Sequence, residues 1–520
     1  MDYPDVPAEP HTLSSLPLEI RLNIASFLNQ IDALSLAKTG KALFDSCLQR
    51  IYDFVVVDAC YTQFSTEYSP HLTYINLLYS LKQYFKALGR SKTRFLHVMC
   101  LPDLTNIYNV EIQQFMTHFI SGLVNLRDLV WQCENFTLEQ LYNLPNPHLL
   151  KSLRVNISHA SLASRLEQSF GFQNLRNLQI RPFANQKRLV DLLGCILEGK
   201  NELDSLDVAR FDSDSPALIP AREINNLGQS IEDLEPLLAD IETNTLDVVV
   251  KSNFAGNFRH LSELCLNSIL VSEHDAILLK ETVHLPHLTT LKLKNIAEFG
   301  CSGERTPTEG FLGLLSPHLI NLAHLHLDYR ETGRDTIVDF LQNVPFLKSL
   351  DLTVRMNAYK KRHVDETQLY SEIGAAISAQ RNLKTLSLEL RREHSFCEIV
   401  MPTPQVMLTG LAYVTNLKSL RLACVEMHAH EAFNKSVLRL KDLRFLHVFG
   451  VNTVPNLGLG MVHPNIYDEW FKVLHFAQEY LQIQRQLRYV RINECVFESD
   501  GDIVHPRDTI DRWFENIVRV

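Results

Sequence analysis

The sequence has no long apolar run and no excess of positive charge. No stretch approaches the roughly 18 to 20 apolar residues that a membrane-spanning helix needs. The first residues, MDYPDVPAEPH, are acidic where a secretory signal would be basic and then apolar. Basic residues number 50 and acidic ones 60, so the formal net charge is 50 − 60 = −10, without the basic excess of a nucleic-acid binder. These absences predict an intracellular protein of the cytoplasm or nucleus, with neither a membrane nor a nucleic acid as its partner.

Paired cysteines and catalytic motifs are also missing. The ten cysteines stand singly, with no CxxC pair, and are expected to be reduced thiols without zinc. The chain has no GxxxxGK[ST], HExxH or GxSxG motif. His428 and His430 have no third ligand nearby in the sequence, so loop positions are favoured over a metal site. We therefore expect no enzyme activity, no catalytic residue, no metal and no cofactor.

Three short helical patterns follow an acidic leader over residues 1–12. Pro17 and Glu19 suit the first turn of a helix, because proline fits there and a carboxylate complements the helix dipole. Asp32 is expected to open a second helix that Gly40 closes. The apolar faces of the first and third helices comprise Ile20, Ile24, Phe27 and Leu28, and then Leu43, Phe44, Cys47, Leu48 and Ile51. So few residues bury little surface, so this unit is expected to lean on a partner or a neighbouring domain.

Residues 13–58 resemble the F-box. The matching residues are Leu16, Pro17, Glu19, Ile20, Ile24, Phe27, Leu28, Asp32, Leu34, Lys41, Leu43, Ile51 and Tyr52. One departure is Phe44, near where many F-boxes carry tryptophan. The resemblance implies that this segment binds the small adaptor protein of a ubiquitin ligase, and the assigned residues are Leu16, Pro17, Ile20, Ile24, Leu28 and Leu34. The alternative is an ordinary three-helix cap on the next domain.

The rest of the chain repeats the pattern Leu-x-x-Leu-x-apolar. It starts at residues 126, 150, 175, 203, 261, 288, 322, 347, 383, 417, 443 and 487. Most steps between these starts are 24 to 36 residues. Between the repeated motifs, apolar residues recur at the spacing of an amphipathic helix, as in Ile337, Phe340, Leu341 and Val344. This pattern resembles the leucine-rich repeat, which implies one short strand and one helix per turn of a horseshoe.

The resulting prediction is an α/β chain in which a small three-helix F-box precedes an irregular leucine-rich-repeat solenoid. Residues 59–125 are expected to hold a helical linker and a first repeat, with a strand at 94–98. Repeats follow over 126–505, and an amphipathic capping helix over 506–520 contains Ile510, Trp513, Phe514 and Ile517. The acidic stretch 209–260 is either a degenerate repeat or an insertion. The Asn or Cys that follows the strand in many leucine-rich repeats is mostly absent, so irregular curvature is expected.

Two surfaces of the repeats are candidates for target binding. The first is a basic rim in loops after the strands, formed by Arg355, Lys360, Lys361, Arg362, His363, Arg391 and Arg392. Such a rim suits an acidic or phosphorylated peptide, because arginine offers forked donors to carboxylate or phosphate. The second is the concave face near Arg421, Phe445, His447, Phe449, Arg488, Tyr489 and Arg491. The competing interpretations are solvated loops for the rim and an ordinary exposed sheet for the face.

The two resemblances together imply the substrate receptor of an SCF-type ubiquitin ligase. Its partners would be the adaptor, through it the cullin and RING subunits, and a target protein held by the repeats. Such a receptor performs no bond chemistry and acts by proximity. The alternatives are a scaffold that binds partners without ubiquitylation, and an enzyme, which would need a catalytic site in a pocket of the horseshoe.

Overall fold

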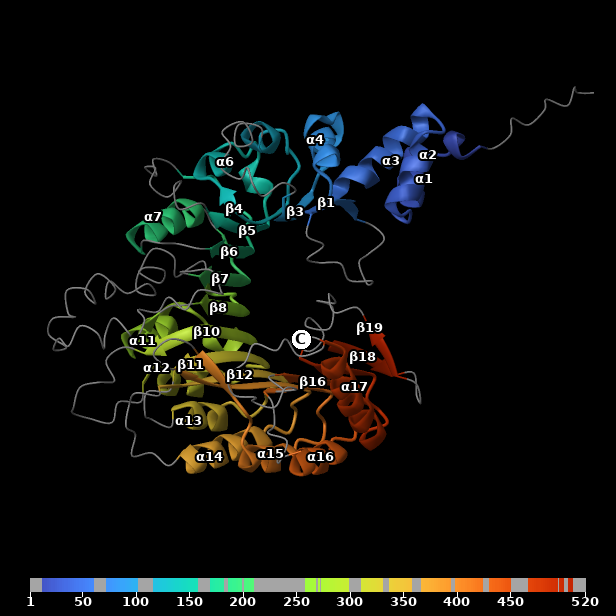
Figure 1. Cartoon of the computed structure of the whole chain (residues 1–520). Coiled ribbons are helices and arrows are strands. Elements are labelled where there is room, and N and C mark those ends of the chain that lie inside the picture. Colours follow the sequence, from blue (N-terminus) through green and yellow to red (C-terminus); the bar gives the residue numbers. More distant parts are fainter. Residues whose placement is uncertain are drawn as a thin grey trace, which may run out of the picture. The chain divides into compact units, whose positions relative to one another are not determined.

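The chain forms a mixed α/β structure in which strands and helices alternate and most strands are parallel (Figure 1). The computed structural model describes residues 12–59, 72–101, 116–157, 169–181, 186–198, 201–209, 258–267, 270–271, 273–298, 310–330, 336–357, 366–393, 398–423, 430–449, 466–493, 495–499 and 504–507. Two compact units divide the chain. Unit 1 comprises residues 1–182 and 191–201, and unit 2 comprises residues 183–190 and 202–520. Among the described residues, no helix combines the length and apolarity needed to cross a bilayer.

Unit 1 begins with three helices behind a short 3-10 turn. These elements are η1 (Leu13–Ser15), α1 (Leu18–Ser26), α2 (Gln30–Ala37) and α3 (Lys41–Asp53). Glu19 lies in the first turn of α1, as predicted, whereas Pro17 directly precedes the helix, at the N-cap position and not in the first turn. The predicted start of α2 at Asp32 is wrong, because the Asn29 side chain caps the helix by accepting a hydrogen bond from the Asp32 N–H at 2.8 Å. Gly40 precedes α3 and does not close α2, which ends at Ala37.

A parallel sheet with the strand order β2-β1-β3-β4-β5-β6 forms the rest of unit 1. Its strands are β1 (Phe54–Asp58), β2 (Thr73–Ile75), β3 (Phe95–Cys100), β4 (Asp128–Phe136), β5 (Ser152–Ile157) and β6 (Asn177–Arg181). The accompanying helices are α4 (Leu78–Lys86), η2 (Leu88–Lys92), α6 (Leu138–Tyr142) and η4 (Pro147–Leu149), and α7 (Gln186–Leu197) follows β6. The predicted strand at 94–98 is therefore confirmed as β3.

A longer sheet forms unit 2. Its strands are β7 (Ser205–Ala209), β8 (Glu263–Asn267), β9 (Leu270–Val271), β10 (Thr290–Glu298), β11 (His324–Arg330), β12 (Ser349–Asn357), β13 (Thr385–Glu393), β14 (Glu398–Met401), β15 (Ser419–Ala423), β16 (Phe445–Phe449), β17 (Tyr489–Ile492), β18 (Cys495–Ser499) and β19 (Val504–Arg507). Its helices are α11 (Glu273–Thr282), η7 (Leu285–His287), α12 (Gly310–Leu315), η8 (Ser316–His318), α13 (Thr336–Asn343), α14 (Glu366–Ser378), α15 (Gln405–Leu411), α16 (His430–Arg439) and α17 (Ile466–Ile483).

The pairing in unit 2 is parallel from β7 to β17 along the order β7-β8-β10-β11-β12-β13-β15-β16-β17, with β9 beside the end of β10. β14 pairs antiparallel with β13, and β18 and β19 continue antiparallel from β17. Each helix from α11 to α16 packs against the next, and Figure 1 shows α13 to α16 along one side of the strands.

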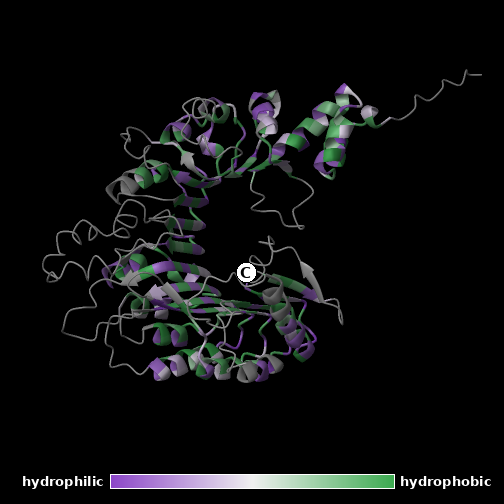
Figure 2. Ribbon diagram, in the orientation of Figure 1, coloured by the Kyte–Doolittle hydropathy of each residue, from purple (hydrophilic) through white to green (hydrophobic). Residues whose placement is uncertain are grey.

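The leucines of the repeated pattern form the core of this sheet. Leu347, Leu350 and Leu352 are fully buried around β12, and Ile337 and Phe340 of α13 are fully buried as well. Parallel strands joined by helices turn one face toward those helices. Leucines occupy that face, so leucine alternates with other residues along each strand. Figure 2 shows this alternation as green and purple bands along the strands.

The strands β7 and β8 are neighbours in the sheet although a long segment separates them in the sequence. The two strands pair directly, with Ser205 opposite Glu263 and Ala209 opposite Asn267. The stretch 209–260, predicted to hold a degenerate repeat or an insertion, falls almost entirely outside the described residues. Residues 210–257 lie outside the described part.

Several predicted loops are instead strand. β10, β12 and β13 run to Glu298, Asn357 and Glu393, so Arg355, Arg391 and Arg392 belong to the sheet. Residues 398–401 form a further strand, β14. The predicted capping helix over 506–520 is wrong at its start, because residues 506 and 507 belong to the strand β19. Residues 508–520 lie outside the described residues.

Asparagines link successive repeats, although the Asn that follows the strand in many leucine-rich repeats is mostly absent here. The side-chain amides of Asn125, Asn174, Asn321 and Asn416 each donate to a backbone carbonyl of the preceding repeat at 2.6 to 2.9 Å. Each of these asparagines directly precedes the leucine that opens its repeat. The signal was therefore present in the sequence as a recurring Asn-Leu pair.

Candidate protein-interaction surfaces

The three N-terminal helices have a small core built partly from small side chains. Ala25, Ala33, Cys47 and Ile51 are buried at its centre, and Leu28, Leu36, Ala37 and Tyr52 pack around it. Two buried or partly buried arginines add hydrogen bonds between helices. Arg21 donates to the Ala42 carbonyl at 2.7 Å, and Arg50 donates to the Leu28 carbonyl at 3.0 Å. Burial lowers the pKa of the Arg50 guanidinium from its ordinary value, although Asp53 acts in the opposite direction.

Large apolar side chains remain outside this core. Of the six residues assigned to the adaptor, Pro17, Ile20 and Leu34 are exposed, while Leu16, Ile24 and Leu28 are half-buried. Further exposed apolar residues are Leu18, Phe27 at 71%, Ile31 at 76% and Phe44. We name Leu18, Ile20, Phe27, Ile31, Leu34 and Phe44 the apolar surface. Phe27 and Phe44, which belong to the predicted apolar faces of the first and third helices, lie outside the core formed by Ala25, Ala33, Cys47 and Ile51.

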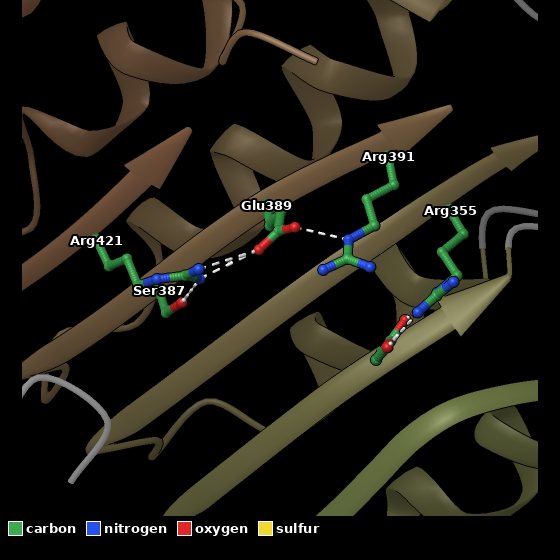
Figure 3. A network of polar contacts seen from close by, with 6 residues as sticks. Arg355, Ser387, Glu389, Arg391 and Arg421 are labelled. Atoms are coloured by element: carbon green, nitrogen blue, oxygen red, sulfur yellow. Dashed lines mark hydrogen bonds and ion pairs between the residues drawn. The ribbon is translucent and has the colours of Figure 1, made fainter. Parts of the chain in front are cut away.

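A second surface is the face of the unit 2 sheet whose side chains alternate with the core leucines. We call this the polar face. Two arginines on it bind a single buried carboxylate: Arg421 donates to Glu389 at 3.2 Å and to Ser387 at 3.1 Å, and Arg391 donates to Glu389 at 2.6 Å (Figure 3). Glu389 is only 4% exposed. Because a buried charge is costly unless it is paired, the two arginines offset the negative charge of Glu389 within the sheet.

Arg355 is a further member of this polar network. Its guanidinium donates two hydrogen bonds to the Asp328 carboxylate, at 2.5 and 2.8 Å, from β12 to β11 (Figure 3). Both side chains are largely buried, at 7% and 14% exposure. The placement of Arg355 in a solvent-facing loop is therefore wrong. The prediction that His447 and Arg491 are exposed on the sheet is also wrong, because these residues are only 7% and 6% exposed.

Asp351, on the same face, has a carboxyl group with a strongly lowered pKa. Burial would raise the pKa of its carboxyl group, but hydrogen bonds from His326 and Ser387 and the positive charge of Arg421 outweigh burial. The net effect holds the pKa well below the ordinary range. His326 lies 2.7 Å from the Asp351 carboxylate. The sequence period of two placed Asp351, Ser387 and Arg421 on one face, but only the cross-strand register shows that they are neighbours.

Aromatic rings continue the polar face toward β17. The Arg421 guanidinium carbon lies 4.1 Å from the Phe449 ring centroid, and the Phe445 and Tyr489 rings stack at 5.5 Å. The Tyr489 hydroxyl donates to Glu498 at 2.9 Å. Of the predicted target-binding residues, the structure thus brings Arg421, Phe445, His447 and Arg491 onto adjacent strands. Lys360, Lys361 and Arg362 lie outside the described residues.

Within the described part of the chain, no group of three or more His, Cys, Asp and Glu side chains is placed to hold a metal ion. A scan against models of known protein families and a search of curated protein sequences both return no match. The two surfaces themselves are thus the basis for any assignment of function.

Proposed function

We propose that this chain is the substrate-recognition subunit of an SCF-type E3 ubiquitin ligase. In this proposal the F-box-like helices bind the adaptor, and an irregular leucine-rich-repeat solenoid binds the target. The single observation that carries it is the apolar surface on α1 to α3. Six large apolar side chains there are 41% to 76% exposed on helices whose own core is small. So many exposed large apolar side chains on three short helices are typical of a protein interface.

The repeats support the second half of the proposal. Parallel strands with packed helices give a rigid face on which side chains from many repeats converge. The polar face presents partly exposed aromatic and arginine side chains, Phe445, Phe449, Tyr489 and Arg421, which are residue types common in binding hot spots. The receptor would act by holding a target near the ubiquitin-charged enzyme, with no bond chemistry of its own.

The decisive experiment is co-purification of the full chain with the adaptor, cullin and RING subunits. Burying an Ile or Leu side chain contributes roughly 1.5 to 3 kcal/mol, so Ile31→Ala with Leu34→Ala should weaken adaptor binding at least about tenfold. The matched control is Leu77→Ala with Tyr79→Ala, because these two side chains are 61% and 73% exposed outside the three helices. The proposal fails if the Ile31/Leu34 variant keeps full adaptor binding.

The alternative is a scaffold that binds partners without ubiquitylation. It has the same apolar surface and the same repeats, so the distinction lies in what co-purifies. Adaptor without cullin and RING subunits would favour the scaffold. Recovery of all three, together with ubiquitylation of a bound protein in a reconstituted reaction, would favour the ligase.

A further inference from the structure

A column of positive charge runs along one edge of the unit 2 sheet. The residue just before each of five adjacent strands, β12, β13, β15, β16 and β17, is a lysine or arginine. These residues are Lys348, Lys384, Lys418, Arg444 and Arg488, and all five are exposed. Their backbones are directly linked, since each N–H donates to the carbonyl of the preceding member at 2.8 Å.

More cations gather beside this column. In the five-residue segments that end in each member, Arg381, Lys441 and Arg485 are also exposed, and Asp442 is the one acidic residue. These segments carry eight positive charges and one negative charge, a sum of 8 − 1 = +7 in a chain whose net charge is −10. We name these eight residues the basic edge.

The column itself does not continue onto the preceding strands of unit 2. The corresponding residues before β7, β8, β10 and β11 are Asp204, Ser262, Thr289 and Ala323. Strands lie about 4.8 Å apart, so the column is about 19 Å long. Phe346 and Tyr413, which are 61% and 68% exposed, lie close to Lys348 and Lys418 in the sequence and add apolar area.

The basic edge differs from the arginines of the polar face. Arg355, Arg391 and Arg421 bind carboxylates of the sheet itself. Among the residues that the structure describes, none of the eight basic-edge side chains forms an ion pair with a carboxylate. Eight like charges in so small an area repel one another, and an anionic partner relieves that repulsion.

We infer that the basic edge is a docking surface for a short acidic segment of a partner protein. About six extended residues span 19 Å, so a short run of Glu and Asp matches the column. A polynucleotide would extend beyond the column toward the rest of an acidic chain, which disfavours it. The inference does not depend on ubiquitin-ligase activity, because a receptor and a scaffold would use the same surface.

The test uses the full chain and a fluorescein-labelled peptide with about six consecutive glutamates, read by fluorescence anisotropy. The same peptide with glutamines is the uncharged comparison, and oligothymidylate is the nucleic-acid probe. We expect the glutamate peptide to bind, and to bind more weakly as salt shortens the screening length from about 10 Å at 0.1 M to about 3 Å at 1 M. The glutamine peptide should not bind.

The variant Lys418→Gln, Arg444→Gln and Arg488→Gln should weaken this binding about tenfold or more. Arg127→Gln, Lys151→Gln and Arg176→Gln form a matched control, because these exposed residues precede β4, β5 and β6 of unit 1 and remove the same charge. Thermal unfolding checks that both variants fold. Equal losses in the two variants, no loss in the first, or no binding by the full chain would overturn the inference. Tighter, edge-dependent binding of oligothymidylate would overturn it in favour of a nucleic acid.

Discussion

Asp351 illustrates how a single buried charge couples the stability of unit 2 to pH. Its folded-state pKa lies below the ordinary value of 3.8, so the unfolded chain takes up a proton more readily than the folded one. The stabilisation is therefore complete above about pH 4 to 5 and is lost as the pH falls toward the folded-state value. The charge is maintained by partners on two neighbouring strands, His326 on β11 and Ser387 on β13.

Asp351→Asn should remove this contribution. We expect the variant to lose about 1 to 3 kcal/mol of unfolding free energy at pH 7, because the hydrogen bonds to a charged group become hydrogen bonds to a neutral one. The difference from the unmodified protein should shrink as the pH falls below 4. Urea unfolding between pH 3 and 7 measures both effects, and Asp442→Asn, at an exposed position, is the control. A difference that stays constant with pH would contradict this account.

The Arg355–Asp328 pair should show strong mutual dependence. Replacing only Arg355 with Met leaves the Asp328 carboxylate buried without its main partner, so the free energy of unfolding should fall by about 3 to 5 kcal/mol. Adding Asp328→Ala removes that charge, and the double variant should lose clearly less than the sum of the two single variants. A double-mutant cycle in urea gives the coupling energy, which we expect at about 1 to 3 kcal/mol. Additive losses would show that the pair acts as two independent residues.

At the scale of elements, α14 and α15 approach unusually closely through two glycines. A Cβ atom added to Gly410 would lie 2.7 Å from the Gly374 carbonyl oxygen, and one added to Gly374 would lie 3.2 Å from the Met407 Cα. Both contacts are with backbone, which cannot move aside as a flexible side chain can. These glycines thus set the spacing of the two helices, and with it the spacing of the repeats on either side.

Gly410→Ala should therefore destabilise the protein although alanine favours helix. We expect a loss of about 1 to 3 kcal/mol from overpacking, measured by thermal or urea unfolding. Gly40→Ala is the matched control, since nothing lies within 4 Å of an added Cβ there and its φ of 178° is extended backbone. An increase in stability for Gly410→Ala would mean that the helices separate freely.

The sequence was sufficient to predict where most strands begin, because a core leucine recurs at fixed positions in each repeat. It did not predict where β12 and β13 end. Arg355 and Arg391 look like the start of a solvated loop when read alone. Asp328, which binds Arg355, lies on β11, whereas Glu389 lies two residues before Arg391 on β13 itself. The apolar surface was found in part, through Ile20 and Leu34. Ile31 was missed because the interiors of α2 and α3 are filled by alanine and cysteine, which leaves larger residues outside.

At the scale of the whole chain, the net charge conceals an opposite local one. The sum of −10 indicated only that the protein as a whole lacks the basic excess of a nucleic-acid binder, and a basic rim was expected in loops after the strands. Eight further cations lie directly before, or a few residues before, five strands. The five residues that directly precede the strands are separated by 26 to 44 residues from one repeat to the next, so no long run of basic residues reveals the surface. Stacking of repeats converts a weak periodic preference for Lys or Arg into a continuous surface, which is how a repeat architecture builds binding sites.

The segment between β7 and β8 should be dispensable for the fold of unit 2. Since these strands already pair directly, replacing residues 212–255 with a Gly/Ser linker of about twelve residues leaves enough chain for a parallel crossover. Loop-closure entropy changes only slowly with length, so the thermal midpoint should shift by no more than a few degrees. Circular dichroism and thermal unfolding of the full chain and the shortened chain measure this. Loss of the folded protein would show that the replaced segment contributes to the core.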